Sequence, residues 1–119
     1  MQVNHVPQVK ERILVMNGQC LIQQEQDGKW VTRKVEKAKT KPGLYNIYLS
    51  KPAEQKKIHE GLVVRIDDRY VYQQVQHGYV KHELSSFAQV PAAGSQVSIL
   101  LEHGKTQVSS LKEQLQQTI

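Results

Sequence analysis

The sequence predicts a mainly β protein of the β-rich α+β type, built as a small barrel or bent sheet of short antiparallel strands with minor helix. Three observations predict this class. Stretches rich in β-branched and aromatic residues alternate in polarity, and segments with helical spacing are scarce. In addition, dipeptides that favour tight turns separate those stretches, namely Asn17-Gly18, Asp27-Gly28, His77-Gly78 and His103-Gly104.

The first half of the chain contains two well-marked strands. Residues 29–35 follow the Asp27-Gly28 turn and are rich in residues that favour extended structure, with Trp30 on one face. Pro42-Gly43 then predicts a turn before a strand over 44–49, in which side chains alternate between the two faces.

The second half continues the pattern with shorter spacing. Asp67-Asp68 predicts a tight turn between its first two strands, and His103-Gly104 predicts that the last strand pairs back on the one before it. The predicted strands are 62–66, 69–75, 79–82, 96–101 and 106–108.

Helix is expected in three short places. Pro52 favours a first helical turn over 52–59, and residues 83–88 have room for one turn. The tail 109–119 begins with a serine cap and has apolar residues at four-residue spacing. A free helix of this length is marginal, so the tail must dock on the sheet, bind a partner or fray. Its candidate partner-docking residues are Leu111, Leu115 and Ile119.

A length of 119 residues fits one domain. We divide it into an N-terminal extension (1–12), a first β unit (13–50), a connector or short helix (51–60), a second β unit (61–108) and the tail (109–119).

The two β units share an echo: Gln23-Gln24 and Gly28 recur fifty positions later as Gln73-Gln74 and Gly78. This spacing indicates either a duplication of about fifty residues or a coincidence in a glutamine-rich chain.

Positive charge is concentrated in one quarter of the chain. Segment 29–57 has nine basic and two acidic residues, 9 − 2 = +7, whereas the whole chain carries +5. Such a segment either attracts a polyanion or forms a solvated lysine-rich loop. The aromatic residues within it either stack on bases or pack in the core. The candidate nucleic-acid contacts are Lys29, Trp30, Arg33, Lys34, Lys37, Lys39, Lys41, Tyr45 and Tyr48.

The sequence offers little for catalysis or metal binding. Cys20 is the one cysteine, the five histidines form no close pair of ligands, and no phosphate loop or dinucleotide fingerprint occurs. We therefore expect no catalytic residues, no metal or cofactor, no small-molecule substrate and no membrane association. The expected location is the cytoplasm, because no secretory signal is recognised and disulfides are excluded.

Several short motifs occur in a fixed order from His59 onward. They are His59 to Val64, Arg69 to Val75, Val80-Lys81-His82, Phe87, Val90-Pro91, Gly94, Val97-Ser98-Ile99 and His103-Gly104. In this order the segment resembles the KfrB domain of plasmid-borne proteins, and 17–58 resembles the segment that precedes it in some relatives. The resemblance implies a small accessory domain of conjugative plasmids and other mobile elements, without catalytic residues to carry over.

We therefore expect a non-enzymatic protein-interaction module of a plasmid- or mobile-element-encoded accessory protein, acting in plasmid maintenance or conjugation. Another protein is the expected partner. The alternative is a nucleic-acid-binding β domain that uses the basic segment 29–57 on DNA.

Overall fold

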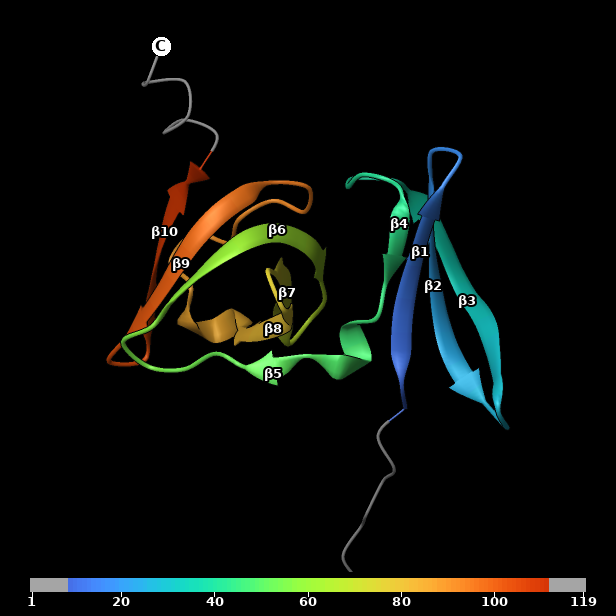
Figure 1. Cartoon of the computed structure of the whole chain (residues 1–119), viewed down its shortest axis with the longest axis horizontal. Coiled ribbons are helices and arrows are strands. Elements are labelled where there is room, and N and C mark those ends of the chain that lie inside the picture. The colour runs from blue at the N-terminus through green and yellow to red at the C-terminus, as the bar shows by residue number, and fades with distance from the viewer. Residues whose placement is uncertain (1–8, 112–119) are drawn as a thin grey trace, which may run out of the picture.

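The computed structural model describes residues 9–111 and confirms a mainly β fold, with ten strands in two sheets (Figure 1). The first sheet has the order β3-β2-β1-β4 and is antiparallel throughout. Its strands are β1 (Glu11–Met16), β2 (Gln19–Gln26), β3 (Lys29–Lys37) and β4 (Gly43–Tyr45). No helix in the described residues is long and apolar enough to cross a membrane.

The second sheet has the order β10-β9-β6-β7-β8-β5 and is strongly curled (Figure 1). Its pairs are antiparallel except for β5, which lies parallel to β8. Its strands are β5 (Lys51–Pro52), β6 (Ile58–Ile66), β7 (Tyr70–Val75), β8 (Gly78–Glu83), β9 (Gln96–Glu102) and β10 (Lys105–Ser110). Of the two expected forms the bent sheet is present and the closed barrel is not, because β5 and β10 do not pair and neither of the two sheets closes.

The predicted hairpin turns are present, and one of them is shifted. Asn17, Asp27 and His103 have positive φ angles of 51°, 53° and 54°, and each precedes a glycine that also has positive φ. These are the backbone conformations that two-residue hairpins require. In the remaining hairpin, which joins β7 to β8, Val75 pairs with Gly78. The turn residues are therefore Gln76 and His77, and the glycine begins β8.

Two local predictions are wrong. Segment 52–59 is not helical, because β5 pairs with β8 and β6 already begins at Ile58, where it pairs with β9. The strand expected over 44–49 ends at Tyr45 and is followed by the 3₁₀ turn η1 (Ile47–Leu49), which buries Ile47. In both places tertiary contacts override local preference.

Other boundaries differ by a few residues. β1 begins at Glu11, inside the segment expected to be an extension, and β10 continues to Ser110, inside the expected tail. The turn predicted over 83–88 is the 3₁₀ turn η2 (Leu84–Ser86). Leu115 and Ile119 lie outside the described residues.

The internal echo corresponds to a shared strand arrangement. In the first sheet the order β3-β2-β1-β4 is a three-strand meander with the fourth strand beside the first. The second sheet contains the same arrangement as β8-β7-β6-β9. The repeated glutamines Gln23 and Gln73 occupy matching central strands, β2 and β7, which is the placement that a duplication predicts.

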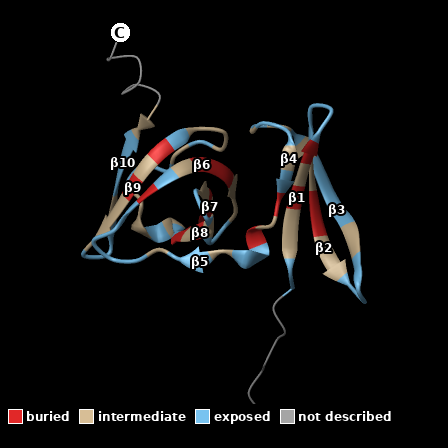
Figure 2. Cartoon of the chain, in the orientation of Figure 1, coloured by how far each residue is buried: buried red, intermediate tan, exposed pale blue. Residues whose placement is uncertain are grey.

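The two sheets pack through equivalent faces. Ile13, Val15 and Ile22 of the first sheet form one buried cluster with Leu62 and Val64 of the second (Figure 2). An ion pair of 3.1 Å between the Arg65 guanidinium and the Glu11 carboxylate spans the same interface. A second cluster lies on the concave face of the curled sheet and consists of Val63, Val71, Val97 and Ile99.

Close backbone contact shapes the curled sheet at Gly61. A Cβ built on Gly61 would lie 1.8 Å from the carbonyl oxygen of Gln74, so only glycine allows β6 to pass β7 this closely. A Cβ on Gly78 has no atom within 4 Å, although its φ of +150° is similar to the +159° of Gly61.

These two glycines give a matched test of the fold. Gly61→Ala should lower the free energy of unfolding by about 1–3 kcal/mol more than Gly78→Ala, because only the first substitution forces the backbone apart. Urea denaturation measures both values. Equal losses for the two variants would contradict the close approach.

Candidate interaction surfaces

The basic residues predicted to contact nucleic acid do not share one face. Lys29, Arg33, Lys34 and Lys37 lie on β3, an edge strand whose side chains alternate between the two faces of the sheet. The register between β2 and β3 also shifts at Ile22/Gln23, which leaves Arg33 without a directly paired residue. Lys39 and Lys41 follow β3 in the loop that leads to β4.

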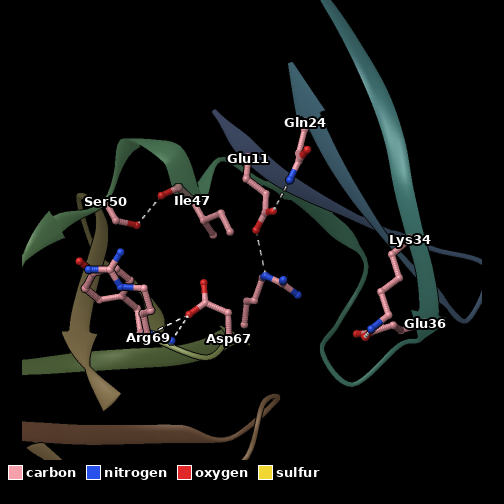
Figure 3. A network of polar contacts seen from close by, with 10 residues as sticks. Glu11, Gln24, Lys34, Glu36, Ile47, Ser50, Asp67 and Arg69 are labelled. Carbon is pink, nitrogen blue, oxygen red and sulfur yellow. Dashed lines mark hydrogen bonds and ion pairs between the residues drawn. The ribbon is translucent and has the colours of Figure 1, made fainter. Parts of the chain in front are cut away.

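Several of these candidates are already engaged, and Figure 3 shows one such contact, between Lys34 and Glu36. Lys34 forms an ion pair of 3.0 Å with Glu36, and this hydrogen bond lowers the pKa of the Glu36 carboxyl. Arg33 donates a hydrogen bond of 2.5 Å to Gln26. Tyr45 is 3% exposed, and its hydroxyl donates to the Lys41 carbonyl, so it belongs to the core and cannot stack on a base.

Aromatic and cationic groups do meet beside the start of β1. The rings of Trp30 and Tyr48 lie 5.5 Å apart, the Arg12 guanidinium lies 4.3 Å from the Trp30 ring centre, and Lys10 Nζ lies 5.6 Å from that of Tyr48. Sequence reasoning missed Lys10 and Arg12, because they fell within the supposed extension. The apolar run 13–16, directly before the Asn17-Gly18 turn, was the signal that could have extended a strand back toward them.

The outer face of the first sheet, the face turned away from the second sheet, has an apolar row that crosses all four strands. Leu44 pairs with Leu14, Leu14 with Leu21, and Leu21 with Val35. Val35 and Leu44 are 52% and 45% exposed. Exposed apolar residues that are contiguous, rather than scattered, mark surfaces that bind other molecules.

Polar groups border this row on its Arg12 side. Gln23 is 8% exposed, accepts a hydrogen bond of 2.8 Å from Arg12 and donates one of 3.1 Å to Thr32. Glu25, on the same strand face as Gln23, lies 3.9 Å from Lys10. This end of the outer face is therefore ordered and mainly cationic.

The matching face of the second sheet is covered. The chain that joins β8 to β9 runs over 84–95, and its Leu84 and Phe87 pack on the concave cluster. The equivalent connection in the first sheet is only 38–42, and no strand equivalent to β10 follows β4. Within the part of the chain that the structure describes, the first sheet therefore has no counterpart of the segments that cover this face in the second.

A buried polar cluster occupies the concave face of the second sheet. Gln73 is fully buried and donates from Nε2 to the carbonyls of His59 and Val97, both at 3.1 Å. Its Oε1 must then accept, so His82 Nε2, at 2.9 Å, carries the proton. The Nδ1 atoms of His59 and His82 have no hydrogen-bond partner.

A hollow of about 320 Å³ lies next to this cluster, between the two unpaired edges of the second sheet. Tyr70, Lys81, His82, Ser86 and Thr106 are among the residues that line it. The nearby Ser86 hydroxyl donates to the Glu83 carbonyl, and the Thr106 hydroxyl donates to the Ser86 carbonyl.

Cys20, the one cysteine, packs against the buried cluster between the two sheets. Burial raises the pKa of its thiol, which keeps the sulfur protonated. Within residues 9–111, no three metal-ligating side chains come together.

Two comparisons with known proteins extend these observations. The KfrB Domain family matches residues 58–110, the segment that forms β6 to β10. Protein TraB of Escherichia coli is 32% identical over 106 residues, which cover 86% of this chain and 73% of TraB. Because it covers 86% of the chain, the second match extends beyond the KfrB segment into the first sheet. Both findings support the expected association with plasmids.

The buried histidines predict acid sensitivity. Burial, and then the neighbouring His59, lower the pKa of His82 from 6.5 to about 4. The unfolded chain binds this proton near pH 6.5 and the folded chain does not. The contribution of neutral His82 to the free energy of unfolding is therefore fully present above about pH 6.5 and decreases as the pH drops toward about 4.

Between pH 7 and pH 5, the titration of His82 alone should lower the free energy of unfolding by about 2 kcal/mol. Urea denaturation at the two pH values measures it. The His82→Gln variant should lose much of this dependence, whereas His77→Gln, in an exposed turn, should keep it. If the free energy of unfolding of His82→Gln depended on pH as strongly as that of the native chain, His82 would not be the source of the acid sensitivity.

Proposed function

Because the chain belongs to the family of proteins that carry a KfrB domain, we propose that it is a non-enzymatic protein-interaction module of a plasmid- or mobile-element-encoded accessory protein. It acts in the cytoplasm, in plasmid maintenance or conjugation. The outer face of the first sheet is its binding surface. One observation carries this proposal: no segment within residues 9–111 covers the apolar row from Leu44 to Val35, whereas the matching face of the second sheet is buried.

The surroundings of the row indicate the chemistry of the partner. Lys10 and Arg12 lie at one end, and Lys37, in register with Gln19, lies on the same face of β3 as Val35. Glu25 is the acidic residue among them. The matching partner is an apolar segment of another protein that is flanked by carboxylates, since opposite charges fix orientation and speed association.

Substitutions on the row test the proposal. Val35→Lys with Leu44→Lys should keep the fold, because both side chains are exposed, but should abolish binding by placing charge in an apolar contact. Ile58→Lys is the matched control, since Ile58 is a 57% exposed apolar residue on the second sheet.

The measurement is affinity purification of the tagged full-length chain from cells that carry its plasmid, with co-purified proteins quantified by mass spectrometry. The partner should be retained by the native chain and by Ile58→Lys, and should drop at least about tenfold, or about 1.4 kcal/mol, with the double variant. A partner that is retained equally by all three chains would exclude the outer face.

DNA binding is the second candidate function, and the group formed by Lys10, Arg12, Trp30 and Tyr48 favours it. A π-face beside cations suits the stacking of single-stranded bases over a neutralised backbone.

Titration of labelled single-stranded DNA, followed by Trp30 fluorescence, tests this candidate. If about four phosphates are neutralised, the logarithm of the binding constant should fall with the logarithm of salt with a slope of roughly −3. Arg12→Gln should weaken binding and make this slope less steep, by the amount that corresponds to about one phosphate contact. Lys57→Gln, on the connector, should change neither the binding constant nor the slope. No fluorescence change at low salt would eliminate DNA as a ligand of this group.

A further inference from the structure

The described residues contain four edge strands, and three of them are protected against pairing with another chain. The edges are β3 and β4 of the first sheet and β5 and β10 of the second. β3 is charged along its length and has an irregular register with β2. β4 has three residues, and β5 has two, one of which is Pro52. Charge, bulges, proline and short length are the features by which natural sheets prevent edge pairing.

β10 has none of these protective features beyond Lys105 at its beginning. It has six residues and pairs with β9 in an unbroken register, from Lys105 opposite Glu102 to Ser110 opposite Val97. The stretch Thr106–Ser109 carries no charge and no proline. In the described part of the chain β9 is its one strand neighbour, so its other edge is a template for a further strand.

A groove of about 1040 Å³ accompanies this edge. It lies between β10 and the loop 88–92. Val90 and Val108 are on its walls and are 45% and 38% exposed. A strand added to β10 would place alternate side chains over this groove, so that pairing would bury apolar surface as well as join backbones.

We propose that β10 pairs antiparallel with β10 of a second copy of this chain, which joins the two curled sheets into one continuous sheet. Antiparallel pairing of a strand with itself is symmetric and closes after two copies. It also places Lys105 opposite the far, uncharged end of the other copy's strand, so that like charges do not meet. This association uses the second sheet and leaves the outer face of the first sheet open, and it does not depend on the proposed function.

Sedimentation velocity of the full-length chain over about 1 µM to 1 mM, a range that spans weak to moderate affinities, tests the proposal. The native chain should change from monomer to dimer. Val108→Lys should raise the dimer dissociation constant at least about tenfold, because charge at an edge opposes pairing. The conservative Val108→Thr variant should remain dimeric. Circular dichroism verifies that each variant is folded.

Two controls separate this interface from others. Val35→Lys, on the outer face, and the tail variant Leu115→Ser with Ile119→Ser should both keep the dimer. Amide hydrogen exchange in Thr106–Ser109 should be slower at the dimeric concentration than at the monomeric one. A monomer at every concentration would overturn the proposal, and so would a dimer that survives Val108→Lys or that is lost in either control.

Discussion

A sheet with two apolar faces must have both of them covered, and this requirement organises the whole molecule. The two sheets cover one face each by packing together around Ile13, Val15, Leu62 and Val64. The second sheet covers its other face by curling around Val63, Val71 and Ile99, beneath Leu84 and Phe87. Among residues 9–111 no segment covers the outer face of the first sheet, and this uncovered face is the proposed binding surface.

The same strand arrangement has a different structural role in each of the two units. In the second unit, Gln73 lies in the core and is held by backbone carbonyls and by His82. In the first unit, Gln23 holds the matching position but is bonded to Arg12 and Thr32 at the border of an open face. The long connection after β8 and the added strand β10 account for the difference, because they supply cover in one unit alone.

The sequence predicted the elements that depend on local chemistry. The hairpins at Asn17-Gly18, Asp27-Gly28 and His103-Gly104 follow from residues that accept positive φ, and most strands follow from alternation. Elements that depend on distant contacts were mispredicted. Segment 52–59 is not helical because its two ends pair with β8 and β9, with a turn at Gln55–Lys56 between them, and nothing local in the sequence indicates these pairings.

The candidate site could be predicted only in part. Trp30 and Tyr48 were recognised as candidates. The cations beside their rings are Lys10 and Arg12, which reach the rings only once β1 has joined the sheet. The apolar row also escaped sequence reasoning. Leu14, Leu21, Val35 and Leu44 lie on four different strands, so the register and not the sequence spacing aligns them.

Photo-crosslinking inside plasmid-bearing cells tests the central claim most directly. A photoreactive amino acid at Val35 should give one dominant crosslink to a second protein, and the same group at Ile58, exposed on the other sheet, should give none. If Val35 gives no crosslink while Ile58 does, the uncovered face of the first sheet is not the surface that this protein uses.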